Sequence, residues 1–117
     1  MPDVPTPPVL ALVRDLIFAS RITATARLVQ VDVNLISDPA RLADQPGSLL
    51  IVDLNLPGAV DAAANWKRTH NREVVGFVSH VDTETITRAQ QAGLDRAMAR
   101  SGFVAALATI LKAAPQS

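Results

Sequence analysis

The chain has 117 residues, 49% of them hydrophobic, with 11 basic and 11 acidic side chains, so we expect one folded domain rather than a disordered chain. The balanced charge, with no run of Lys or Arg longer than two residues, argues against a nucleic-acid partner, and the absence of cysteine excludes disulfides and thiolate metal sites. The start lacks the pattern of a secretory signal and no apolar run reaches about 20 residues, so we expect a cytoplasmic protein with no membrane partner.

The first third of the chain changes from strand to helix periodicity. Residues 1–8 are rich in proline and predict a flexible segment that precedes a single domain at 9–112. The apolar run Val9–Val13 predicts a first strand. From Leu16 the pattern indicates an amphipathic helix of about four turns. Its apolar positions recur every three or four residues, at Phe18, Ile22, Ala26 and Val29.

The middle of the chain contains two further strand patterns. Alternating residues in Val31–Ile36 predict a half-exposed strand at a sheet edge. Asp38, followed by a proline, predicts the cap of a short helix, which Pro46-Gly47 ends. The central strand is expected at 48–54, because consecutive apolar residues there precede a carboxylate and then a Pro-Gly pair.

The second half of the chain continues the same alternation. The expected elements, in order, are a helix that ends at His70, a strand at 74–78, a helix capped by Asp82 and closed by Gly93, a strand at 95–100, a helix capped by Ser101, and a tail at 113–117. Five strands that alternate with helices predict an α/β fold, a doubly wound parallel sheet with helices on both faces. The size fits the flavodoxin-like strand order 2-1-3-4-5 best.

Polar side chains follow several of the predicted strands, at the sheet edge where ligands of open parallel sheets bind. Asp53 ends the central strand, and Arg14 and Asp15 follow the first strand, which the predicted order places beside it. Asp15 and Asp53 would offer Mg²⁺ two carboxylates. Ser79 and Arg100, after the fourth and fifth strands, offer a hydroxyl and a cation to a phosphoryl oxygen. No glycine-rich phosphate loop follows any strand.

The segment Leu50–Gly58 resembles the phosphoacceptor segment of the receiver domains of bacterial two-component response regulators, the CheY-like fold. The resemblance extends over nearly the whole chain, and Ala92-Gly93 looks like the Ala-Gly pair that closes the family's fourth helix. It implies that Asp53 is the phosphoacceptor, that the backbone carbonyl of Asn55 would bind Mg²⁺, and that Ser79 is the switch hydroxyl.

Four positions depart from the family pattern. Arg14 stands where the family has an acid, and Arg100 where it has a lysine. Ser101 replaces the next proline, and Ala97 replaces the aromatic ring that moves with the switch hydroxyl. Two carboxylates balanced by Arg14 and Arg100 need no divalent ion, and Arg14 would take the place of the metal. We therefore expect a pseudo-receiver, with no cofactor or with weakly bound Mg²⁺.

The favoured function is a signalling module, not an enzyme, that binds a protein partner such as a sensor kinase or a downstream effector. By resemblance, the partner or homodimer surface lies on the helix after Asp82, the fifth strand and the last helix. Exposed residues there would be Arg88, Gln91 and Arg96, and Phe103 is either an apolar anchor or a core residue. Two alternatives stay open: a receiver phosphorylated on Asp53 with Asp15 alone holding Mg²⁺, and a small flavodoxin-like ligand-binding domain or enzyme.

Overall fold

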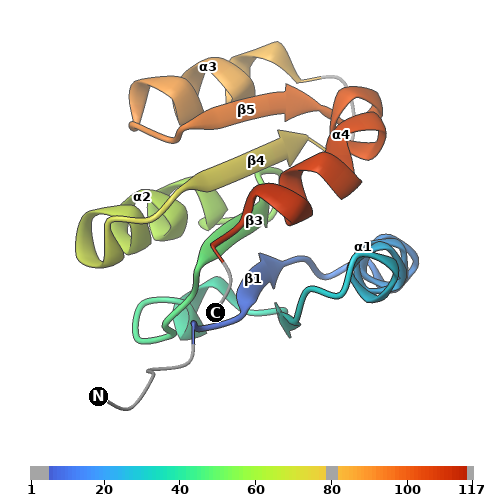
Figure 1. Ribbon diagram of the computed structural model, residues 1–117. Helices are drawn as coiled ribbons and strands as arrows, with labels where there is room; N and C mark the ends of the chain where they lie inside the picture. The colour runs from blue at the N-terminus through green and yellow to red at the C-terminus, as the bar shows by residue number, and fades with distance from the viewer. Residues whose placement is uncertain (1–5, 79–81, 116–117) are drawn as a thin grey trace.

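The computed structural model describes residues 6–78 and 82–115. Figure 1 shows one sheet with helices packed on both of its faces. The strands are β1 Val9–Leu12, β2 Val33–Ile36, β3 Leu49–Asp53, β4 Val74–Val78 and β5 Arg96–Ala99. Neighbouring strands are parallel throughout, and the order β2-β1-β3-β4-β5 confirms the predicted flavodoxin-like topology, with β2 at an edge.

The helices cover the two faces of the sheet in pairs. They are α1 Leu16–Leu28, η1 Pro39–Arg41 (a short 3₁₀ helix), α2 Ala59–His70, α3 Thr83–Gln91 and α4 Arg100–Ala113. Helices α1 and α4 pack against one face, and α2 and α3 against the other. None of the helices in the described part of the chain is long and apolar enough to cross a bilayer.

Each face of the sheet has its own hydrophobic core. On the α1–α4 face, Phe18, Phe77 and Phe103 stack on one another with ring centroids 4.5 to 5.8 Å apart. Phe103 is fully buried, so it is a core residue and not a surface anchor. On the opposite face Trp66 is fully buried, and its Nε1 donates a hydrogen bond of 2.8 Å to the carbonyl of Gln45.

The expected helix caps are present at two of three positions. Asp38 caps η1 through the amide of Ala40, and Asp82 caps α3 through the amide of Thr85. The third expectation is wrong, because Ser101 lies inside α4 and the N-cap position belongs to Ala99, whose side chain can make no capping bond. The cause is that β5 runs directly into α4, leaving no loop residue between strand and helix.

Four of the five strands are shorter than the sequence predicts. β1 ends one residue early, and β3 loses one residue at each end. β2 begins at Val33, because Val31 still belongs to the connection after α1 and its amide donates to the carbonyl of Ala26. β5 ends at Ala99, so Arg100 is the first residue of α4 and not the last of a strand.

The described ends of the chain pack beside the sheet. The carbonyl of Pro8 accepts a hydrogen bond of 3.0 Å from the amide of Ser48, so the proline-rich segment joins the sheet at its last residue. At the other end α4 continues to Ala113, and the side chain of Ala114 is buried in the α1–α4 core. The segments expected to be a flexible lead and a tail therefore include residues that contact the domain.

Candidate functional site

Asp53 is the last residue of β3, at the carboxyl edge of the sheet. β3 lies between β1 and β4, and Asp53 is in register with Phe77 of β4. Its side chain is only 7% exposed, although every other residue of β3 is apolar. Asp53 Oδ1 accepts a hydrogen bond of 3.0 Å from the amide of Asn55, which fixes the turn that follows the strand. The position of this carboxylate is the one that the sequence predicts.

A side-chain bridge connects the turn after Asp53 to the start of α3. Asn55 Nδ2 donates a hydrogen bond of 3.0 Å to Asp82 Oδ2. The other oxygen of Asp82 accepts from the amide of Thr85 at 3.0 Å, and Thr85 Oγ1 donates to Asp82 Oδ2 at 2.5 Å. The sequence indicates Asp82 as a helix cap but contains no spacing that pairs it with Asn55. The predicted metal role of the Asn55 carbonyl stays a prediction.

Asp15 follows β1 at the same edge of the sheet, as expected. Its carboxylate is the N-cap of α1: Oδ1 accepts from the amides of Ile17 at 2.9 Å and Phe18 at 3.3 Å. A carboxylate at this position also stabilises the positive end of the helix dipole. The described hydrogen bonds of Asp15 therefore fix the start of α1, and they do not connect Asp15 to Asp53.

Arg14 contacts the backbone beyond the edge strand. Its Nε donates a hydrogen bond of 3.3 Å to the carbonyl of Ser37, which follows β2. β2 and β3 lie on opposite sides of β1, so this contact draws Arg14 away from Asp53. The ion pairs among the described residues are Lys67–Asp95 and Arg96–Glu73, and neither involves Arg14. Replacement of a metal ion by Arg14 stays a prediction.

Arg100 lies over an aromatic ring at the start of α4. Its guanidinium carbon is 5.0 Å from the centroid of the Phe18 ring, a cation–π contact. This contact joins the start of α4 to the first turn of α1. Ala97, where the resemblance implies an aromatic residue, is half-buried in β5 opposite Gly76. Ser79, the predicted switch hydroxyl, lies outside the described residues.

The donor set for a metal ion is smaller than the resemblance implies. In the described ranges, no group of three or more His, Asp or Glu side chains could hold a metal ion. The two carboxylates that follow β1 and β3, those of Asp15 and Asp53, each accept hydrogen bonds from backbone amides. Arg14, where the resemblance implies a further acid, offers a metal ion no ligand. Among the described residues at this edge, two carboxylates therefore stand where the resemblance implies three, and they do not fit its acid-rich site.

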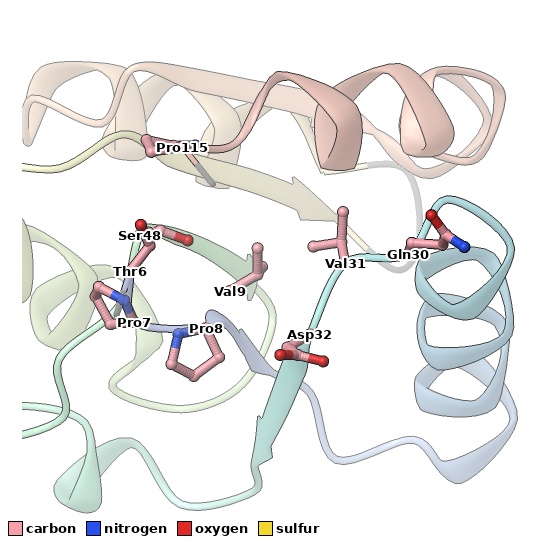
Figure 2. Close-up of a pocket in the computed structure, with 9 residues that line it drawn as sticks. All are labelled: Thr6, Pro7, Pro8, Val9, Gln30, Val31, Asp32, Ser48 and Pro115. Carbon is pink, nitrogen blue, oxygen red and sulfur yellow. The ribbon is translucent and has the colours of Figure 1, made fainter. Parts of the chain in front are cut away.

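A cavity of about 210 Å³ lies at a different edge of the molecule, and Figure 2 shows the residues that line it. It lies beside the first residues of β1 and β3 and beside the start of β2, at the amino-terminal edge of the sheet. Its lining includes the carboxylate of Asp32 but none of the predicted site residues. The cavity is therefore separate from the edge that carries Asp53.

Comparison with solved structures identifies the architecture as the CheY-like receiver fold. No protein-family model and no curated protein matches the chain. Solved receiver domains align with it over 92% of its length, and the resemblance predicted from Leu50–Gly58 is confirmed at the level of the fold.

Three of these structures give the range of similarity. A CheY-like response regulator receiver domain protein from Methanospirillum hungatei is 12% identical, with a TM-score of 0.77 over 91% of that chain. A response regulator from Thermotoga maritima is 15% identical, with a TM-score of 0.73 over 95% of that chain. The receiver domain of a sensor histidine kinase from Pseudomonas aeruginosa, solved with magnesium in its active site cleft, is 18% identical, with a TM-score of 0.75 over 95% of that chain.

Proposed function

We propose that this protein is a cytoplasmic signalling module of receiver fold, not an enzyme, that acts by binding a protein partner and accepts phosphate poorly or not at all. The fold supports the first part of the proposal. The observation that carries the second part is Arg14, a cation bound to the Ser37 carbonyl at the position of an expected acid. The partner would be a sensor kinase or a downstream effector.

The electrostatics of Asp53 support a degenerate site. Phosphorylation would convert the buried carboxylate of Asp53 into an acyl phosphate, which carries more negative charge. Phosphoryl transfer normally depends on a divalent ion to neutralise this charge. Of the two cations expected to help, Arg14 is bound to the Ser37 carbonyl and Arg100 lies over Phe18. These contacts hold both guanidinium groups on other parts of the chain. Because an expected metal-site acid is also missing at Arg14, we expect Mg²⁺ to bind weakly and the transfer to be slow.

The test is the intact mass of the protein after incubation with acetyl phosphate, with and without Mg²⁺. We expect no Mg²⁺-dependent gain of a phosphoryl group under conditions that label an ordinary receiver domain. A gain that requires Mg²⁺ and disappears in Asp53→Asn would overturn the degenerate site, and the protein would then be a phosphorylated receiver.

A second variant tests the cause. Arg14→Asp restores the expected acid, and we predict that it gains both Mg²⁺ binding and labelling of Asp53. Arg21→Asp is the matched control, because it makes the same change of charge at an exposed position of α1. If both variants behave alike, the effect is one of net charge and Arg14 has no special role.

A further inference from the structure

The amino-terminal edge of the sheet holds a cavity that the candidate site does not use. Its volume is about 210 Å³, and its lining comes from both ends of the described chain, from the segment after α1 and from the residue before β3 (Figure 2). Pockets for drug-sized ligands measure about 300–1,000 Å³, so this cavity suits a smaller molecule than a nucleotide or a flavin. Its size restricts the ligand to a molecule of a few carbon atoms.

The inner wall of the cavity presents a hydroxyl group. Ser48 is only 2% exposed, and its amide donates a hydrogen bond of 3.0 Å to the carbonyl of Pro8. Its hydroxyl takes part in none of the hydrogen bonds between the described residues. Among these residues no fully enclosed side-chain oxygen lacks a partner, so the Ser48 hydroxyl opens onto the cavity that the residue lines. This hydroxyl can accept a hydrogen bond from a ligand.

The charge of the cavity is negative. Asp32 is the one charged residue among the described residues that line it, and the ion pairs between described residues do not involve this exposed carboxylate. The lining also contains Gln30 and Pro115, which follow α1 and α4, so both helices end at this cavity. The C-terminal end of a helix carries a partial negative charge that attracts cations. These features together favour a cationic ligand.

Two other cations suit the cavity less well. A divalent metal ion needs several oxygen ligands, and the described lining adds no second carboxylate and no imidazole to Asp32. The side chain of Arg27, in the last turn of α1, lines a neighbouring hollow beside Asp32. It does not line the cavity itself and forms no ion pair with Asp32. Arg27 therefore competes with a ligand for the carboxylate without occupying it.

Asp32 and Ser48 lie on opposite sides of β1. They directly precede Val33 of β2 and Leu49 of β3, and both of these residues are in register with Val9 of β1. Neighbouring strands are about 4.8 Å apart, which places the backbones of Asp32 and Ser48 about 10 Å apart. Figure 2 shows the two residues on either side of Val9. One short molecule with a polar group at each end can therefore reach both.

We propose that the cavity binds a short aliphatic diamine. One ammonium group pairs with the Asp32 carboxylate, the other donates a hydrogen bond to the Ser48 hydroxyl, and the carbon chain packs on apolar lining residues such as Val9 and Val31. A second ammonium is favoured over a neutral end because two helices end at the same cavity. The proposal goes beyond the function proposed for the opposite edge of the sheet and does not depend on it.

The experiment titrates isotope-labelled protein with diaminobutane, which carries an amine at each end, and follows amide chemical shifts and Tm. We expect saturable shifts at the residues that line the cavity and a rise in Tm, because the ligand binds only the folded state. Diaminoethane is too short to reach both polar groups, and n-butylamine lacks the second ammonium. Both should bind about tenfold more weakly, the loss expected for one charge-assisted hydrogen bond.

Variants of the chain test each contact. Asp32→Asn should weaken the binding of diaminobutane about tenfold, whereas Asp44→Asn, at an exposed carboxylate outside the lining, should leave it unchanged. Ser48→Ala should lower the affinity for diaminobutane to that for n-butylamine. Arg27→Gln removes the competing cation and should strengthen binding. Circular dichroism of each variant separates lost binding from lost folding.

Three results would overturn the proposal. These are equal affinities of the wild type for diaminobutane and n-butylamine, equal losses of affinity in Asp32→Asn and Asp44→Asn, and chemical shift changes confined to the edge that carries Asp53. The comparison of amines uses only the wild-type chain, so it remains decisive if Ser48→Ala does not fold. Phosphoryl labelling and amine binding are measured separately, so either proposal can fail without the other.

Discussion

Truncation of Phe103 tests whether the aromatic stack holds α4 on the sheet. Phe103→Ala removes a fully buried ring whose centroid lies 4.5 Å from that of Phe77 and 5.8 Å from that of Phe18. Large-to-small truncation of a buried phenylalanine costs about 3–5 kcal/mol, a value that includes the lost ring contacts. A domain of this size has about 5–15 kcal/mol of stability in total.

The expected change is therefore large and easy to measure. With an unfolding entropy of about 2.1 cal/mol/K per residue, a loss of about 4 kcal/mol lowers Tm by about 16 °C. Urea unfolding followed by far-UV circular dichroism gives the free energy directly. Phe103→Leu keeps most of the buried volume and should lose about 1–2 kcal/mol. A loss below about 1 kcal/mol for Phe103→Ala would refute the packing argument and would indicate that Phe103 is a surface residue.

Two further predictions concern an ion pair and a glycine. Partial burial raises the pKa of Asp95, but hydrogen bonds from Lys67 and a backbone amide, with the charge of Lys67, outweigh it, so the pKa lies below its ordinary value of 3.8. The resulting stability is present above pH 3.8 and is lost as the pH falls through the lower folded pKa. Asp95→Asn should lower the free energy of unfolding by about 1 kcal/mol at pH 7, a modest value because the ion pair is about a third exposed. In urea titrations the variant should also lose this contribution to the fall in stability at acid pH. If its stability falls with acid as steeply as that of the wild type, the prediction is contradicted. Gly47→Ala places a Cβ 2.7 Å from the Leu10 side chain and should lower stability by about 1–3 kcal/mol in thermal unfolding. Gly102→Ala is the control, because open space surrounds Gly102 and an alanine in a helix should raise Tm. Equal effects of the two changes would contradict the predicted clash.

The fold was predictable because its signals are local. Apolar runs, the change from a period of two to one of 3.6 and the Pro/Gly stops each depend on a few adjacent residues. The same reasoning failed at Ser101, because β5 and α4 meet without a loop and no sequence feature marks their junction. The short η1 was expected, since Asp38 starts it and Pro46-Gly47 limits it.

The contacts of the candidate site were not predictable, although the position of Asp53 was. The bridge from Asn55 to Asp82 joins residues 27 positions apart, and the bond from Arg14 to Ser37 joins residues 23 positions apart. Such contacts depend on how loops meet at the sheet edge, which periodicity does not describe. The exposure of apolar residues on α1 was not predicted for a different reason: residues such as Leu28 are apolar like those of the buried side, so composition does not separate the two.

The separation of the aromatic residues between the two cores has a spectroscopic consequence. The chain contains one tryptophan and no tyrosine, and Trp66 lies on the α2–α3 face, whereas all three phenylalanines lie on the other. Tryptophan emission therefore reports on one side of the sheet only, while far-UV circular dichroism averages over both. Coincident unfolding curves from the two signals would show that the two cores unfold as one cooperative unit. Divergent curves would show that the two sides of the sheet unfold in separate steps.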